Sequence, residues 1–192
     1  MAFTARTPRE AFQTLQDHLN RTLNKVLTRT RLRFSVRHAT QEKTSLAFFD
    51  RQLRPEAVQL HPSLPWYLSL RQDIQAIPEG RGYTLRTLQY AYRIQRSASV
   101  QDEAEVRFEY VSPETDANFP YSRHHVQFHQ DYHEVRERFS LQKLHIPTGG
   151  VTIEHVIRFL IADLGVPPLV TNWDEELKKS EEQSRKWMNQ TQ

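Results

Sequence analysis

One stretch decides the fold class of this chain: Leu88-Gln89-Tyr90-Ala91-Tyr92-Arg93-Ile94-Gln95. Large apolar side chains alternate there with polar or small ones, which predicts a strand with one face in the core. The same alternation returns in Val106, Phe108 and Tyr110, separated by Arg107 and Glu109. A third segment follows at 119–133. No crossover helix fits between the three segments, so they predict an antiparallel meander.

The third segment, Phe119 to His133, is rich in histidine. Five of the nine histidines fall between His124 and His145. As a strand, the segment would place five polar side chains on one face: His125, Gln127, His129, Asp131 and His133. As a helix, three of them would also share a face, at i, i+4 and i+8. We favour the strand, since the segment continues the meander.

Two amphipathic helices flank the strands. Thr7-Pro8-Arg9-Glu10 is a typical helix start, and apolar residues then recur at helical spacing to about residue 28. Thr152 caps a second helix that ends at Gly165. Between them, the alternation of Leu32, Phe34 and Val36 predicts a strand. The segment 66–77 is ambiguous, and the spacing of Leu70, Ile74 and Ile77 suggests a short helix that Pro78 ends.

These patterns predict an α+β fold. We expect an antiparallel sheet of five or six strands, packed by an N-terminal helix (8–28) and a C-terminal helix (152–164). The length of 192 residues fits one domain, which we place at 1–168. Residues 169–192 then form a C-terminal helical arm. Its middle is mostly charged, so we expect it to pack weakly or against a partner.

Composition narrows the class of protein. The chain has no cysteine, which excludes disulfides and thiolate metal sites. No run approaches the roughly 20 apolar residues of a membrane span, and the first residues do not resemble a signal peptide. We therefore expect a cytoplasmic protein without a membrane segment.

The net charge of +3 is unevenly distributed, because the segment from Met1 to His38 contains eight basic residues and only two acidic ones. Such a region attracts phosphate, and nucleic acid is its commonest source. The alternative is a solvated basic face. The expected nucleic-acid contacts are Arg29, Arg31, Arg33 and Arg37, together with Arg93 and Arg107 on the strands.

Part of the chain, from about Tyr90 to Val166, resembles a known family. Its features are Tyr92-Arg93 at a strand start, Asp116-Ala117-Asn118 before Arg123-His124-His125, and a closing helix over 151–164. In these it resembles the TumE-like family, small proteins classed as toxins of bacterial toxin–antitoxin pairs. The resemblance implies a toxin or defence-type effector that acts on RNA and has a cognate antitoxin.

The histidines support metal-independent RNA cleavage as the leading hypothesis. Cleavage by transesterification needs a base, an acid and a cation, which histidine and arginine supply without a cofactor. We assign the acid and base to His125 and His129, the phosphate clamp to Arg123, and stacking or hydrogen bonding to Tyr121. Because His125 and His129 lie about 13 Å apart on a strand, His125 pairs more easily with Arg93 or Arg107 on neighbouring strands.

Three alternatives remain open. Helical spacing would let His125, His129 and His133 bind a metal, but on a strand His125 and His133 lie about 26 Å apart. The histidines could also be solvent-facing strand residues without a chemical role. Finally, the protein could be a non-catalytic binding module. Its basic segment Arg29–Arg37 and C-terminal helix would then bind nucleic acid, another protein or a second copy.

Overall fold

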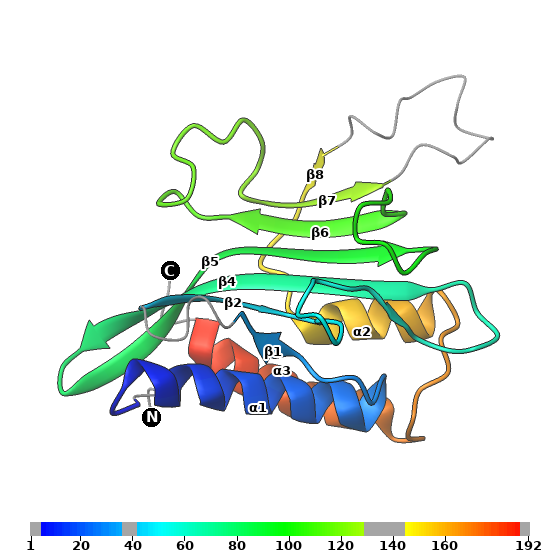
Figure 1. Cartoon of the computed structure of the whole chain (residues 1–192), viewed down its shortest axis with the longest axis horizontal. Helices are drawn as coiled ribbons and strands as arrows, with labels where there is room; N and C mark the ends of the chain where they lie inside the picture. Colours follow the sequence, from blue (N-terminus) through cyan, green and yellow to red (C-terminus); the bar gives the residue numbers. More distant parts are fainter. Residues whose placement is uncertain (1–4, 36–41, 129–144, 189–192) are drawn as a thin grey trace.

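In the computed structural model, one long antiparallel sheet forms the body of the protein, and the three helices of the described residues lie against it (Figure 1). The structure describes residues 5–35, 42–128 and 145–188, and the side chains of 145–147 and 185–188 lie outside the description. The elements are α1 (Pro8–Val26), β1 (Arg33–Phe34), β2 (Lys43–Ala47), β3 (Val58–Gln59), β4 (Tyr67–Glu79), β5 (Gly82–Gln95), β6 (Val106–Val111), β7 (His124–Phe128), β8 (His145–Pro147), α2 (Ile153–Ala162) and α3 (Trp173–Met188).

The strands follow one another across the sheet in chain order. Among the described residues, seven strands lie in the order β1-β2-β4-β5-β6-β7-β8, and the short β3 also pairs with β4. Every pair is antiparallel. The predicted α+β fold with an antiparallel meander is therefore confirmed, with more strands than the five or six expected.

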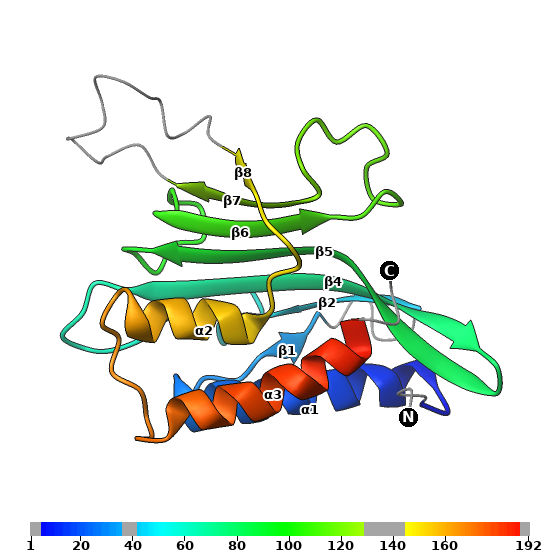
Figure 2. The same cartoon turned by 180° about the vertical axis from the view of Figure 1, so that it is seen from behind.

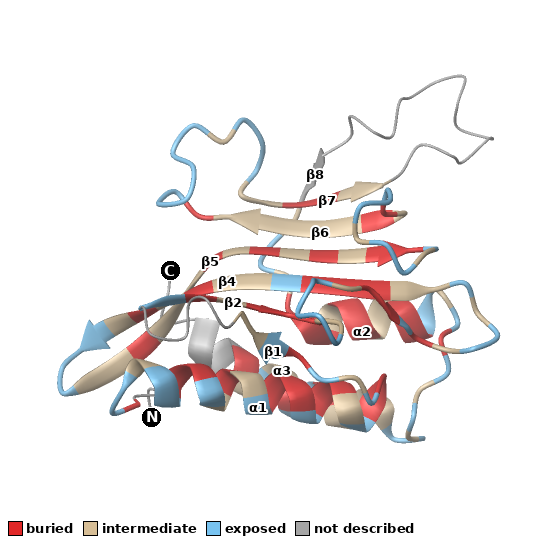
Figure 3. Cartoon of the chain, viewed as in Figure 1, coloured by how far each residue is buried: buried red, intermediate tan, exposed pale blue. Residues whose placement is uncertain are grey.

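The alternation in β5 and β6 has the predicted effect on the two faces of the sheet. Tyr92 lies opposite Phe108, and Phe108 opposite Val126. On this face the Phe108 ring meets Phe159 of α2 edge-on, with ring centroids 5.8 Å apart. Figure 3 shows buried and half-buried positions alternating along β5. The side chains between them point to the other face, which we call the open face.

The suggested helix at 66–77 is wrong. Residues 67–77 belong to β4, which pairs with β5 over its whole length. Leu70 and Ile74 are buried on the same side because a separation of four also returns to the same face of a strand. Pro78 lies near the tip of the hairpin, where Gly80 turns the chain with a φ of 58°.

Both predicted helices begin where the sequence indicates, and each ends two residues earlier than predicted, α1 at Val26 and α2 at Ala162. The Thr7 side chain accepts a hydrogen bond from the Glu10 N–H, and Thr152 caps α2 in the same way through His155. Gly165, with a φ of 68°, follows the end of α2. In the described ranges no helix is both long enough and apolar enough to cross a membrane.

The C-terminal helix does not behave as a weakly packed arm. It runs antiparallel to α1 and contacts both α1 and α2 (Figure 2). Leu177 is fully buried in this contact. Some of the charged residues of α3 pair with the neighbouring helices, Glu176 with Lys25 of α1 and Glu181 with His155 of α2. The hydroxyl side chains of Ser180 and Ser184 are buried on its inner side.

Candidate nucleic-acid interface

The open face carries arginines from four strands. The register of the strands places the residues of this face in two neighbouring rows that run across the sheet. The first is Arg33–Ala47–Arg71–Ala91–Glu109–His125, and the second is Ser69–Arg93–Arg107–Gln127. Because alanine and serine stand between the long side chains, the centre of the face is hollow. The resulting groove has a volume of about 660 Å³, and its lining includes Arg71, Arg93, Arg107 and Glu109.

Arg93 and Arg107 lie directly opposite each other on β5 and β6. Like charges in that position are unfavourable. The guanidinium of Arg93 donates to the carbonyls of Val100 and Asp102, each at 2.5 Å, while its Nε–H is buried without a partner. Burial lowers the pKa of Arg93, and the charge of Arg107 lowers it further.

No carboxylate in the described part of the chain lies within ion-pair distance of the Arg93 guanidinium. Among the described residues its hydrogen-bond acceptors are therefore carbonyls, and the charges of Glu109 and Asp102 act on it from beyond ion-pair distance. A half-buried guanidinium that lies next to another guanidinium and is bound by carbonyls alone in the described residues suits the binding of an anion.

Arg107 has better partners than Arg93. It donates to the Gln127 side chain at 2.6 Å, and its Nη1 lies 3.9 Å from Glu109 Oε1. The other oxygen of Glu109 lies 3.3 Å from His125 Nε2. Glu109 thus lies between Arg107 of β6 and His125 of β7 and contacts both side chains.

The alternative that His125 is a solvent-facing strand residue is wrong. β7 does place His125 on the polar face with Gln127, but the side chain is only 1% exposed. The reason is the loop before β7, whose Phe119 and Tyr121 rings lie within about 6 Å of the imidazole. His125 Nδ1 donates to the Ser122 carbonyl at 3.0 Å, because a carbonyl can only accept.

The remaining assigned residues of this region have separate positions. Tyr121 is 48% exposed above His125. Arg123 donates to the carbonyls of Asp116 and Ala117 and so braces the loop. His124 points to the opposite face, where it stacks on Tyr110 with centroids 4.3 Å apart. Burial lowers the pKa of His124, and His125 adds to the effect.

Only part of the basic segment Arg29–Arg37 lies on the open face. Arg33 stands at the edge of the first row, whereas Arg29 and Arg31 are exposed between α1 and β1. Arg29 donates to the Asn24 carbonyl at the end of α1. Arg37, His129 and His133 lie outside the described residues.

Sequence reasoning missed a buried polar cluster between the three helices. Its centre is Glu154 of α2, which is fully buried. Glu154 Oε1 accepts hydrogen bonds from Ser180 at 2.5 Å and Ser184 at 2.8 Å, both on α3. His18 of α1 lies 3.6 Å from the same oxygen. Burial would raise the pKa of Glu154, but hydrogen bonds from His18 and Ser180 prevail and lower it to about 2.

The hydrogen bonds fix the proton positions in this cluster. Each serine has one hydroxyl hydrogen, and Glu154 takes both. The serine oxygens near His18 Nε2, at 3.1 and 3.2 Å, therefore accept, and Nε2 carries a hydrogen. Serine and carboxylate meet the same ring nitrogen, which differs from a Ser-His-acid triad, where they use opposite nitrogens.

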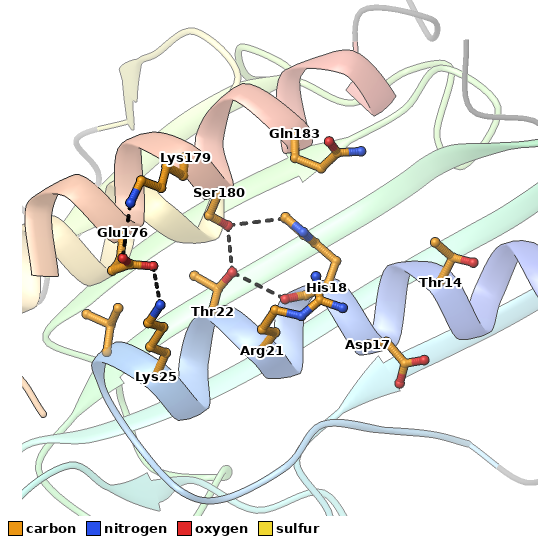
Figure 4. Close-up of a pocket in the computed structure, with 11 residues that line it drawn as sticks. Thr14, Asp17, His18, Arg21, Thr22, Lys25, Glu176, Lys179, Ser180 and Gln183 are labelled. Carbon is orange, nitrogen blue, oxygen red and sulfur yellow. Dashed lines mark hydrogen bonds and ion pairs between the residues drawn. The ribbon is translucent and has the colours of Figure 1, made fainter. Parts of the chain in front are cut away.

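A groove of about 570 Å³ runs above this cluster between α1 and α3. Figure 4 shows His18, Thr22 and Ser180 meeting at its centre. On one side of them Glu176 binds Lys25 at 2.6 Å and Lys179 at 3.3 Å.

Comparisons of the chain with protein-family models, curated proteins and solved structures give no match.

Proposed function

We propose that the protein binds single-stranded RNA across the open face of its sheet. The observation that carries this proposal is the Arg93–Arg107 pair. Two like charges lie directly opposite each other, and Arg93 keeps a buried N–H without a partner. A phosphate placed between the two guanidinium groups would relieve their repulsion.

The spread of the arginines favours a polyanion over a single phosphate. Arg33, Arg71, Arg93 and Arg107 come from β1, β4, β5 and β6. Neighbouring strands lie about 4.8 Å apart, so the row from β1 to β6 spans roughly 19 Å. A chain of phosphates can follow such a row, and binding would then depend steeply on salt.

Aromatic side chains favour a single strand over a duplex. Phe119 and Tyr121 lie at the β7 end of the arginine rows, and Tyr121 offers an exposed ring. Unpaired bases stack on such rings, whereas the bases of a duplex are not available. The choice of RNA over DNA rests on the resemblance to the TumE-like family.

The test is fluorescence anisotropy with a labelled 20-nucleotide RNA at several salt concentrations. The double variant Arg93→Ala/Arg107→Ala should bind at least tenfold more weakly. Its salt slope should fall by about 0.7 to 1.4, since each phosphate contact on a single strand contributes about 0.7 and at least one of the two arginines contacts phosphate. The matched control is Arg9→Ala/Arg21→Ala, which removes two exposed arginines from α1.

The control variant should bind with nearly the affinity and salt slope of the wild type. An equal loss of RNA affinity in the two double variants would mean that only net charge matters, and the open face would not be the binding site. Absence of binding by the wild-type protein at 50 mM salt would overturn the proposal entirely.

RNA cleavage and a role as a toxin remain predictions. His125 is buried and contacts Ser122 and Glu109 of the protein itself, so binding is the better-supported activity. The same RNA, incubated with protein in EDTA and run on a denaturing gel, tests cleavage. Products that vanish in His125→Ala/His129→Ala but persist in Arg93→Ala would restore the nuclease hypothesis.

A further inference from the structure

We propose that the open face reads guanine, with Arg107 and Glu109 as the residues that determine specificity. This inference rests on the proposed RNA binding. It comes from the placement of a donor group beside an acceptor group on one strand. Arg107 and Glu109 are two positions apart on β6, so both side chains point to the open face. Arg107 Nη1 and Glu109 Oε1 lie 3.9 Å apart.

Both groups are accessible from the groove. The Arg107 side chain is 35% exposed and that of Glu109 is 24% exposed, and both line the groove of about 660 Å³. The alanines of the first row, Ala47 and Ala91, leave space beside them. A volume of several hundred cubic ångströms is the size at which proteins bind small molecules, and it accommodates one base.

Glu109 is held in place from behind. Its Oε2 meets His125 Nε2 at 3.3 Å, and His125 is itself anchored through Nδ1 to the Ser122 carbonyl. This arrangement positions Glu109 and leaves Oε1 facing the arginine side of the groove.

A carboxylate on an RNA-binding face repels phosphate, so its natural partner is a base that donates hydrogens. The Watson–Crick edge of guanine presents the acceptor O6 followed by the donors N1–H and N2–H. Arginine beside glutamate offers the complementary order of donor and acceptor. Adenine and cytosine begin with a donor amine, which would face Arg107.

Uracil is the nearest competitor. Its O4 and N3–H would meet Arg107 and Glu109 as guanine does, but it lacks the second donor, N2–H. Its third group, O2, is an acceptor that would face the carboxylate. Guanine is therefore the one base of the four whose entire edge matches the pair.

In this proposal, Arg93 binds the phosphate of the bound nucleotide. Arg93 lies directly across the strand pair from Arg107. In this arrangement Arg107 contacts the base and Arg93 the backbone. The two arginines then have different effects: loss of Arg93 weakens all sequences, whereas loss of Glu109 removes the preference among them.

The experiment measures binding of ten-nucleotide oligoadenylates that carry one central guanine, inosine, uracil or cytosine, with the all-adenine strand as reference. We expect the guanine strand to bind about tenfold more tightly than the adenine or cytosine strands. Inosine lacks the N2 amine and should bind with intermediate affinity. This comparison of strands uses only the wild-type protein, so it does not depend on the folding of a variant.

The protein variant is Glu109→Gln, whose amide replaces one acceptor oxygen by a donor. We expect the guanine preference to fall below threefold, while binding of the adenine strand stays equal or improves because a negative charge is lost. The matched control is Glu105→Gln. Glu105 has a similar exposure of 26% but pairs with Arg96 and does not line the groove. Thermal melts confirm that both variants fold.

Two failures can be told apart. If the wild type binds all strands with equal affinity, or prefers another base, the inference is overturned and the proposed RNA binding stands. If no strand binds, the proposed function fails and the inference fails with it. A guanine preference that survives unchanged in Glu109→Gln overturns the assignment of Glu109.

Discussion

The charge of Glu154 can be tested by its effect on acid stability. The carboxylate is fully buried, and its pKa falls from an ordinary value of 4.5 to about 2 in the folded protein. Because the folded pKa is depressed, the ionised group stabilises the fold above the unfolded pKa. That contribution is lost as the pH falls from about 4.5 towards 2.

The magnitude follows from the two pKa values. A difference of about 2.5 corresponds to about 3 kcal/mol at neutral pH. By the same relation, about 1 kcal/mol is lost at pH 4 and about 2 kcal/mol at pH 3. Glu154→Gln removes the charge but keeps an acceptor oxygen for Ser180 and Ser184. We expect this variant to unfold about 3 kcal/mol more easily at pH 7.

The assay is urea unfolding of wild type and Glu154→Gln at pH 7, 5, 4 and 3, followed by tryptophan fluorescence. The gap in the free energy of unfolding should narrow as the pH falls, because acid neutralises the wild-type carboxylate and leaves the amide unchanged. The control is Glu175→Gln, an exposed glutamate on α3, whose gap should stay near zero at every pH. A gap for Glu154→Gln that is constant between pH 7 and pH 3 would refute the reasoning.

Two further predictions concern the backbone. Gly165→Ala should lower the free energy of unfolding by about 1 kcal/mol in a urea titration, because its φ of 68° is costly for alanine even though no atom lies within 4 Å of the added Cβ. Gly149→Ala, with equal space and no positive φ, should be nearly neutral, and equal losses at the two sites would contradict this reasoning. Leu53 has a φ of 61° and is 54% exposed, so Leu53→Asn should raise the free energy of unfolding by about 0.5 kcal/mol, measured by thermal melting; a decrease would show that the leucine side chain has a stabilising contact.

The sequence predicts those parts of the fold in which the pattern of one segment is sufficient. The alternation around Tyr90 and Tyr92 needs no distant partner to indicate a strand, and Thr7 and Thr152 cap their helices locally. At 66–77 the pattern is ambiguous, since Leu70 and Ile74 share a face in a helix and in a strand. Pairing with β5 resolves it, and pairing is a property of the whole sheet.

The candidate site is only partly readable from the sequence. The alternation of β5 and β6 places Arg93 and Arg107 on the polar face, but the register that sets them opposite each other depends on the loop between the strands. The burial of His125 depends on how the preceding loop folds back, which no spacing shows. For Arg37 and His129 the structure gives no placement to compare.

The buried cluster did leave a signal in the sequence. His18 lies between the core residues Leu15 and Leu19, and Glu154 follows Ile153 inside the apolar stripe of its helix. Polar residues at inward positions of three different helices indicate a shared buried network. What the sequence does not show is which helices meet, because residues 18, 154 and 184 are brought together only by the complete fold.

That dependence on distant residues has a consequence for synthesis of the protein on the ribosome. The acceptor, Glu154, emerges before the two serines that satisfy it. Until residue 184 has left the ribosome, the nascent domain must keep this carboxylate hydrated or protonated, so α1 and α2 cannot close over it. The sheet can pair strand by strand as it emerges, but the helical layer is completed only when α3 arrives.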